Sequence, residues 1–171
     1  SYSNRPIDLG GYGVTYAYGY DPEGNMFEME QLDPEPLAQV EAKLRWIDEG
    51  HSMWMTQVAL VTHDIERLTN WYADIMAFMP YRTGDYEGHP RMAEVAGEPY
   101  LSLLASWFRM DSRAKTIELW QYRDPITPEP TSKKGVTDFG YSYSIEVGDI
   151  ATEVGRMSSL GVEFMSEPVN M

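Results

Sequence analysis

The chain has no cysteine, and its only histidines are His51, His63 and His89. Without cysteine there can be no disulfide, no thiolate metal site and no cysteine nucleophile. Any polar chemistry must therefore come from histidine, carboxylate, amide, hydroxyl or phenol groups.

Positive charge is also scarce: 13 Lys and Arg stand against 27 Asp and Glu, and the formal net charge is -14. Nucleic acids and anionic membrane surfaces bind through positive charge that neutralises phosphate, so we expect neither as a partner. No run approaches the roughly 18 apolar residues of a membrane span, and no basic segment precedes an apolar one at the N-terminus. We therefore expect a cytoplasmic protein with a neutral or cationic small-molecule ligand.

The chain does contain enough apolar surface for a packed core. Hydrophobic residues make up 43% of it, with 12 Tyr and 5 Trp. This composition argues against disorder, and 171 residues suit one compact domain or two small halves that share a core.

The N-terminal part predicts a hairpin and then a helix. Aromatic and small residues alternate over 12–20, and the turn sequence DPEGN at 21–25 leads into MFEMEQL. We assign 1–32 to strands. Apolar residues then recur at helical spacing from Leu37 to Ile47, which predicts a connecting helix within 33–51.

The central part, 52–125, predicts a strand, a helix and further strands. MWMTQVALVT predicts the first strand, and Asp64 caps a helix with an apolar face. A loop from Gly84 to Pro90 precedes strands at 100–108 and 115–122, and we interpret the whole stretch as a βαβββ module.

The C-terminal part begins after a Pro-rich linker at 126–135. Within 136–171 the pattern predicts a strand, a helix capped by Asp149 with a glycine at its end, and a second strand.

Two segment pairs repeat within the chain. QVALVTHDI at 57–65 aligns with SYSIEVGDI at 142–150, and IELWQY at 117–122 aligns with FEMEQL at 27–32. The order of the two segments differs between the copies: the strand and helix precede the Glu segment in one copy and follow it in the other. Joining the chain's ends would repair the order.

The aligned positions are few. Gln57 stands opposite Ser142, and Glu118 stands opposite Glu28. If Met171 were joined to Ser1, Ser142 and Glu28 would be 57 residues apart along the chain. This is close to the 61 residues between Gln57 and Glu118. The two modules therefore match in length.

These segments resemble the recurrent segments of the vicinal-oxygen-chelate superfamily of glyoxalases, bleomycin-resistance proteins and extradiol dioxygenases. The resemblance implies an α+β fold in which two βαβββ modules form a cleft. Here 136–171 and 1–32 would be halves of one module, split across the termini by circular permutation or by strand exchange in a homodimer. A fragment of a longer tandem array is the alternative.

The resemblance also implies a metal site with ligands from the first and fourth strands of each module. Those positions are Gln57 and Glu118 in the uninterrupted module, and Ser142 and Glu28 in the split one. A divalent cation such as Zn, Ni, Mn or Fe would suit these oxygen ligands. Ser142 is a weak ligand, and none of the histidines falls on a mapped position.

Two functions remain open. The first is a metal-dependent lyase, isomerase or dioxygenase acting on a small molecule with vicinal oxygens, with Glu118 and Glu28 as catalytic carboxylates. The second is a metal-free small-molecule binding protein resembling bleomycin-resistance proteins, which would hold a cationic ligand in an aromatic-lined, acidic groove. For Glu28 and Glu118 the alternative to a metal or catalytic role is that each caps a solvated strand face. For His63 and His89 the interpretation without a catalytic role is that both are surface residues.

Overall fold

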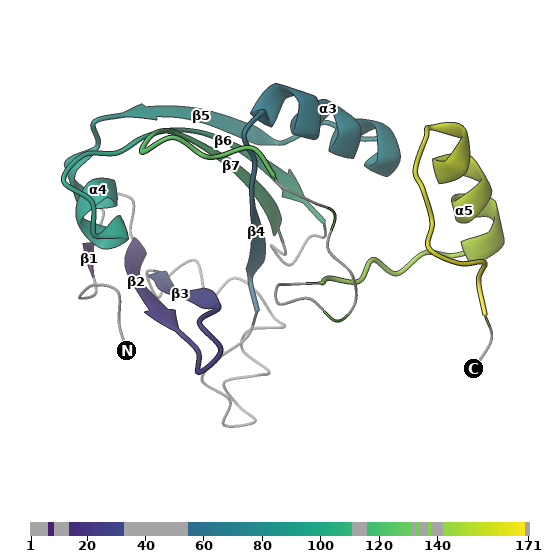
Figure 1. Ribbon diagram of the computed structural model, residues 1–171, viewed down its shortest axis with the longest axis horizontal. Coiled ribbons are helices and arrows are strands. Elements are labelled where there is room, and N and C mark those ends of the chain that lie inside the picture. Colours follow the sequence, from purple (N-terminus) through teal and green to yellow (C-terminus); the bar gives the residue numbers. More distant parts are fainter. Residues whose placement is uncertain are drawn as a thin grey trace.

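The computed structural model describes residues 7–8, 14–32, 55–110, 116–130, 133, 137 and 142–169. Within them the fold is α+β, with two sheets and three helices (Figure 1). The predicted connecting helix in 33–51, and His51, lie outside the described residues. No helix in the described part is both long and apolar enough to cross a membrane.

The N-terminal sheet has the order β1-β2-β3 and is antiparallel. Its strands are β1 (Ile7–Asp8), β2 (Val14–Tyr20) and β3 (Met26–Leu32). Asp21 makes the turn between β2 and β3, because its Oδ1 accepts from the backbone N–H groups of Glu23 and Asn25 at 2.9 and 2.8 Å. Gly24, at φ +83°, supplies the left-handed residue. The predicted hairpin is confirmed.

The central sheet has the order β4-β7-β6-β5, with β4 parallel to β7 and the other pairs antiparallel. Its strands are β4 (Gln57–Val61), β5 (Arg82–Glu87), β6 (Ser102–Arg109) and β7 (Thr116–Asp124). Helix α3 (Ile65–Met76) follows β4, and helix α4 (Pro90–Ala96) joins β5 to β6. The predicted order of strand, helix and three strands is present.

The predicted loop from Gly84 to Pro90 is wrong. Strand β5 runs through its first half, and α4 begins at Pro90. The whole of β5 pairs with β6, so pairing with a buried neighbour overrides the low strand propensity of Gly and Asp.

Successive strand residues point to opposite sides of the central sheet, and both sides contribute buried side chains. One face packs on α3 through Tyr72, Ile75, Phe108 and Leu119. The other carries Leu103, Ala105 and Trp107 under α4, which also contacts β1 and β2. The N-terminal sheet therefore lies on the Trp107 side of the central sheet.

Residues 142–169, the C-terminal arm, carry helix α5 (Ile150–Ser159). Asp149 caps it by accepting from Thr152 N at 2.9 Å, and Gly161 follows it at φ +86°, so the helix, its cap and its terminal glycine are confirmed. No residue of α5 is buried. The arm contacts the end of α3, where Arg156 donates to the carbonyl oxygens of Asp74 and Ile75.

The two strands predicted in the arm are wrong for this structure. Residues 142–147 and 162–169 belong to no strand, and neither stretch joins the N-terminal sheet. Figure 1 shows the arm beside α3, at the opposite end of the molecule from β1, β2 and β3. A strand needs a neighbour for its backbone hydrogen bonds, and at this position the described residues provide none.

Candidate functional site

The candidate site lies where β3 meets the central sheet. Gln57, the first residue of β4, donates from Nε2 to Glu28 Oε1 on β3 at 3.0 Å. Glu28 also accepts from the Tyr18 hydroxyl, and the two residues stand opposite each other in the hairpin. Glu28 therefore accepts hydrogen bonds from side chains of both sheets.

Glu118 is the buried carboxylate of the site, with a relative exposure of 6%. Both of its oxygens accept indole N–H groups: Oε1 from Trp107, its neighbour on β6, and Oε2 from Trp120 at 3.1 Å. Trp120 follows Glu118 by two residues on β7 and so shares its face of the sheet. These two donors make a buried carboxylate tolerable in an apolar strand.

Burial raises the pKa of the Glu118 carboxyl from 4.5 to about 7. The indole hydrogen bonds oppose this rise, whereas the negative charge of Glu28 adds to it. Burial also raises the pKa of Glu28, against the hydrogen bonds from Tyr18 and Gln57. Two carboxyl groups with raised pKa values therefore lie in one region, and the charge of Glu28 disfavours ionisation of Glu118.

Phenol groups line the same region. Burial and the nearby carboxylates raise the pKa values of Tyr16, Tyr18 and Tyr122, so these hydroxyls stay protonated well above neutral pH, and that of Tyr18 donates to Glu28. The guanidinium of Arg82 lies 3.7 Å from the centre of the Trp107 ring and lowers the pKa of Tyr16. Arg82 is thus a positive charge at the edge of an otherwise acidic site.

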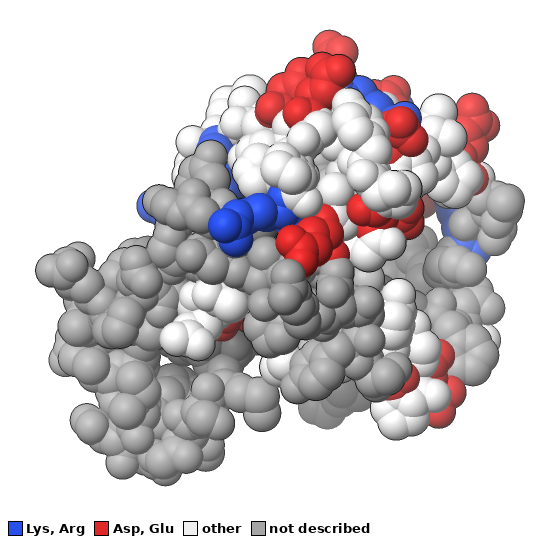
Figure 2. Space-filling model, turned by 90° about the vertical axis from the view of Figure 1, so that its left-hand side faces the viewer, with Lys and Arg blue, Asp and Glu red and all other residues white. Residues whose placement is uncertain are grey.

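Acidic side chains are prominent among the described residues on one face of the molecule (Figure 2). On the face drawn in Figure 2, acidic side chains gather at the upper edge and basic ones lie in small groups between them. This distribution agrees with the net charge of -14 and favours a ligand or ion that is not an anion.

Three of the four predicted ligands lie in this region: Glu28, Gln57 and Glu118. Ser142 does not, because it is an exposed residue of the C-terminal arm and in no strand. The mapping of Ser142 as a ligand therefore stays a prediction. The position depends on a strand that the arm does not form here.

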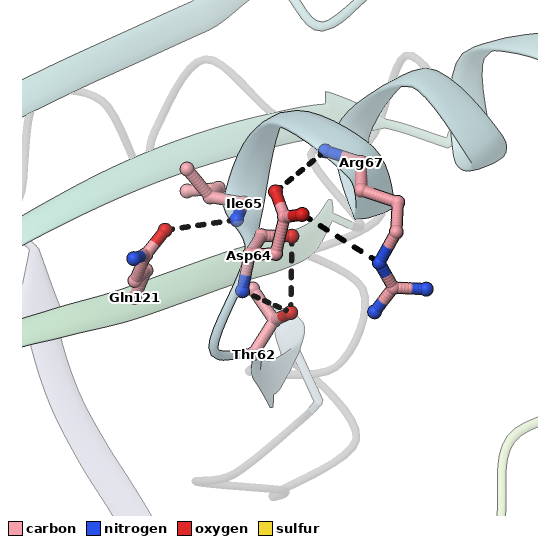
Figure 3. Close-up of polar contacts among 5 residues, drawn as sticks. All are labelled: Thr62, Asp64, Ile65, Arg67 and Gln121. Atoms are coloured by element: carbon pink, nitrogen blue, oxygen red, sulfur yellow. Dashed lines mark hydrogen bonds and ion pairs between the residues drawn. The ribbon is translucent and has the colours of Figure 1, made fainter. Parts of the chain in front are cut away.

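Gln121, the residue after Trp120, has a structural contact. Its Oε1 accepts from the backbone N–H of Ile65 at 2.9 Å and so ties β7 to the start of α3 (Figure 3). Asp64 caps the same helix by accepting from Arg67 N at 3.0 Å, which confirms the predicted cap.

His89 is a helix cap and not an exposed loop residue. Its Nδ1 accepts from Met92 N at 3.3 Å at the start of α4, and the side chain is half-buried. The sequence indicates this role, because His89 directly precedes Pro90 and proline favours the first position of a helix.

The sequence analysis missed the groups that hold the two carboxylates. Trp107, Trp120 and Tyr18 donate to them. Sequence features indicate two of these three donors. Alternation puts Trp120 on the same face of the strand as Glu118, and the turn at 21–25 fixes the register that pairs Tyr18 with Glu28. No sequence feature indicates Trp107, because its pairing with Glu118 depends on how β6 meets β7.

The donor set partly fits a divalent cation. Two carboxylates and an amide oxygen are hard ligands of the kind that such ions accept. Among the described residues, however, no three His, Asp or Glu side chains lie close enough together to hold a metal ion. A complete shell would need the Gln57 amide, a phenol, water or a group from outside the described part.

Comparison with known proteins gives a likeness of fold. No protein-family model and no curated protein sequence matches the chain. A crystal structure of glyoxalase I from Zea mays is similar at 17% identity and a TM-score of 0.44, over 71% of this chain and 34% of the other. A mutant of that enzyme is similar at 21% identity and a TM-score of 0.41, over 72% and 34%. The chain thus spans about a third of the length of these glyoxalase I chains and resembles part of them.

Proposed function

We propose that Glu28, Gln57 and Glu118 hold a divalent metal ion, and that the protein is a metal-dependent lyase, isomerase or dioxygenase for a small molecule with vicinal oxygens. The observation that carries this proposal is that the buried Glu118 and the half-buried Glu28, which Gln57 contacts, both have raised pKa values. Such pairs occur where function requires them, because burying like charges together costs free energy.

A cation would remove that cost. Each carboxylate would gain a positive partner, and the mutual repulsion that raises the pKa of Glu118 would be offset. Oxygen ligands of this kind suit Zn, Ni, Mn or Fe. When bound, the ion would act as a Lewis acid that polarises the substrate's vicinal oxygens.

The chain's own groups would handle the proton. Where Glu118 is not a ligand of the ion, its pKa of about 7 would suit it to accept and return a proton near neutral pH, as a general base requires. Trp107 and Trp120 fix its orientation and exclude water from it. Tyr18 and Gln57 do the same for Glu28, which is the second candidate base.

A metal-free binding protein is the second candidate. Both oxygens of Glu118 already have indole donors, and Ser142 lies outside the site. Phenol and indole groups around two carboxyls would also suit an aromatic cation. In this alternative Glu118 and Glu28 bind the ligand's positive charge and no bond is broken.

The proposal includes the split module. Residues 1–32 and 136–171 would be two halves of a second βαβββ unit, on the strength of the repeats that match Glu28 to Glu118 and Ser142 to Gln57. The small-molecule ligand would then bind between this unit and the uninterrupted one, in the cytoplasm.

Elemental analysis of protein purified without chelator tests the metal. We expect about one equivalent of a divalent metal, and its loss in Glu118→Gln and Glu28→Gln. Glu129→Gln is the matched control, because Glu129 is exposed and follows β7. If the parent protein holds no metal even after incubation with Zn, Ni, Mn and Fe salts, the binding-protein alternative replaces the enzyme.

A further inference from the structure

A groove lies on the face of the central sheet that carries α3. The helix packs on β7 and β6. A helix about 10 Å wide covers two strands that are spaced at about 4.8 Å, so β5 lies beside it rather than under it. The space between α3, β6 and β5 has a volume of about 360 Å³, which is enough for a small molecule.

The groove is separate from the region that holds Glu118. Neighbouring residues of a strand point to opposite faces of its sheet. On β6, Ser106 shares a face with Phe108, which packs on α3, whereas Trp107 between them donates to Glu118. The groove and the carboxylates of the proposed metal site therefore lie on opposite faces of the central sheet.

The floor of the groove contains a hydroxyl group without a partner. Ser106 lines the groove and is 2% exposed, and its Oγ makes no hydrogen bond within the part of the chain that the structure describes. Buried polar side chains nearly always have a partner, so this one needs an explanation. A hydroxyl or carbonyl group of a ligand would supply the missing hydrogen bond, because a serine hydroxyl can both donate and accept.

Carboxylates stand at the rim of the groove. Asp85 of β5 and Glu66 of α3 both line it and are both exposed. The guanidinium of Arg123 pairs with Asp85 and balances its charge. Glu66 forms no ion pair with any residue that the structure describes. The rim therefore has one uncompensated negative charge, on the helix side.

The start of α3 does not offer an anion site that would compete with this charge. The N–H of Ile65 already donates to Gln121, and the N–H of Arg67 donates to the Asp64 carboxylate. Asp64 and Glu66 also place two negative charges at this end of the helix. A cation is therefore the favoured charged group at the rim.

We propose that this groove binds a small organic amine that also carries a neutral polar group, an amino alcohol being the simplest example. Its ammonium group lies at Glu66, its hydroxyl bonds to Ser106 Oγ, and its apolar body lies against Ile65 and Leu104, which also line the groove. The site uses none of the proposed metal ligands and does not depend on the metal.

Amide NMR shifts of the labelled protein test the site, with 4-(aminomethyl)benzyl alcohol as the probe. We expect saturable shifts at residues 65–70, 83–85 and 104–106, with a Kd of about 5 mM for a molecule of this size. Two compounds with the same ring separate the contacts. 4-Methylbenzylamine lacks the hydroxyl group, and 1,4-benzenedimethanol lacks the ammonium group, so both should bind more weakly than the probe.

Two variants assign the contacts to residues. Ser106→Ala should weaken the probe about fivefold and leave 4-methylbenzylamine unchanged. Glu66→Gln should weaken both amines about threefold and leave 1,4-benzenedimethanol unchanged. The matched control is Glu98→Gln, because Glu98 is exposed, follows α4 and does not line the groove. It should bind all three compounds as the parent does.

Three results would overturn the proposal: no saturable shifts in the groove, shifts confined to the residues around Glu118, or equal effects of Ser106→Ala on the probe and on 4-methylbenzylamine. In the last case Ser106 is a buried core residue and not a ligand contact. Metal content of the same variants should equal that of the parent. Groove binding by a protein without metal would refute only the metal site, and a metal-loaded protein without groove binding would refute only the groove.

Discussion

Glu118 should make the stability of the metal-free protein fall as pH rises. Its pKa is about 7 in the folded chain against 4.5 for an ordinary Glu, so the folded state binds the proton more tightly. The contribution to stability is fully present below pH 4.5 and is lost as pH rises through 7. At about 1.4 kcal/mol per pKa unit, the difference amounts to about 3 kcal/mol, most of it between pH 5 and pH 8.

The variant Glu118→Gln isolates this contribution. The substitution also loses one indole hydrogen bond, because an amide nitrogen cannot accept, but that loss is the same at each pH and cancels in the difference. We expect the fall in the free energy of unfolding between pH 5 and pH 8 to shrink by about 2.5 kcal/mol. Glu129→Gln, an exposed change, should leave the fall as it is in the parent.

Urea unfolding at both pH values, in EDTA, measures the effect. The reasoning would be refuted if Glu118→Gln kept the parent's pH dependence, because the buried carboxyl would then not be the titrating group. Addition of a divalent metal should remove most of the fall in the parent, since the cation stabilises the ionised form.

Three further changes test how the site is held. Asp64→Ala should cost about 1 kcal/mol of stability in urea unfolding through loss of the α3 cap, and an unchanged midpoint would contradict the cap. Trp107→Phe should move the pKa of Glu118 above 7 in a carbon NMR titration, because the indole hydrogen bond lowers it; a fall would show that the contact is not a hydrogen bond. Gln121→Ala should cost about 1 to 3 kcal/mol by leaving the Ile65 N–H without its acceptor, and loss of metal without loss of stability would instead place Gln121 in the site.

The elements that the sequence predicted are those determined locally. The hairpin follows from the turn that Asp21 and Gly24 make, and both helix starts follow from an Asp that accepts from the third residue after it. Alternation placed Gln57 and Glu118 in strands, and the structure shows that these strands, β4 and β7, are paired. These signals lie within a few residues of the structure that they determine.

What the sequence did not predict depends on distant partners. Strand β5 was interpreted as a loop because Gly84 and Asp85 disfavour strands, and only pairing with β6 makes them one. The indole of Trp107 reaches Glu118 through a register between β6 and β7 that no local pattern fixes. Ser142 was mapped by repeat alone, and its place depends on which strand the arm meets.

Calorimetric titration of the apo protein with Mn²⁺ at pH 7, in buffers of different ionisation enthalpy, tests the metal site most directly. With a pKa of about 7, about half of the Glu118 carboxyls carry a proton at that pH. Binding should therefore have a stoichiometry of one and release about half a proton, with less at pH 9. Glu118→Gln should abolish both the binding and the release, whereas no binding by the parent, or binding that survives Glu118→Gln unchanged, would contradict the account.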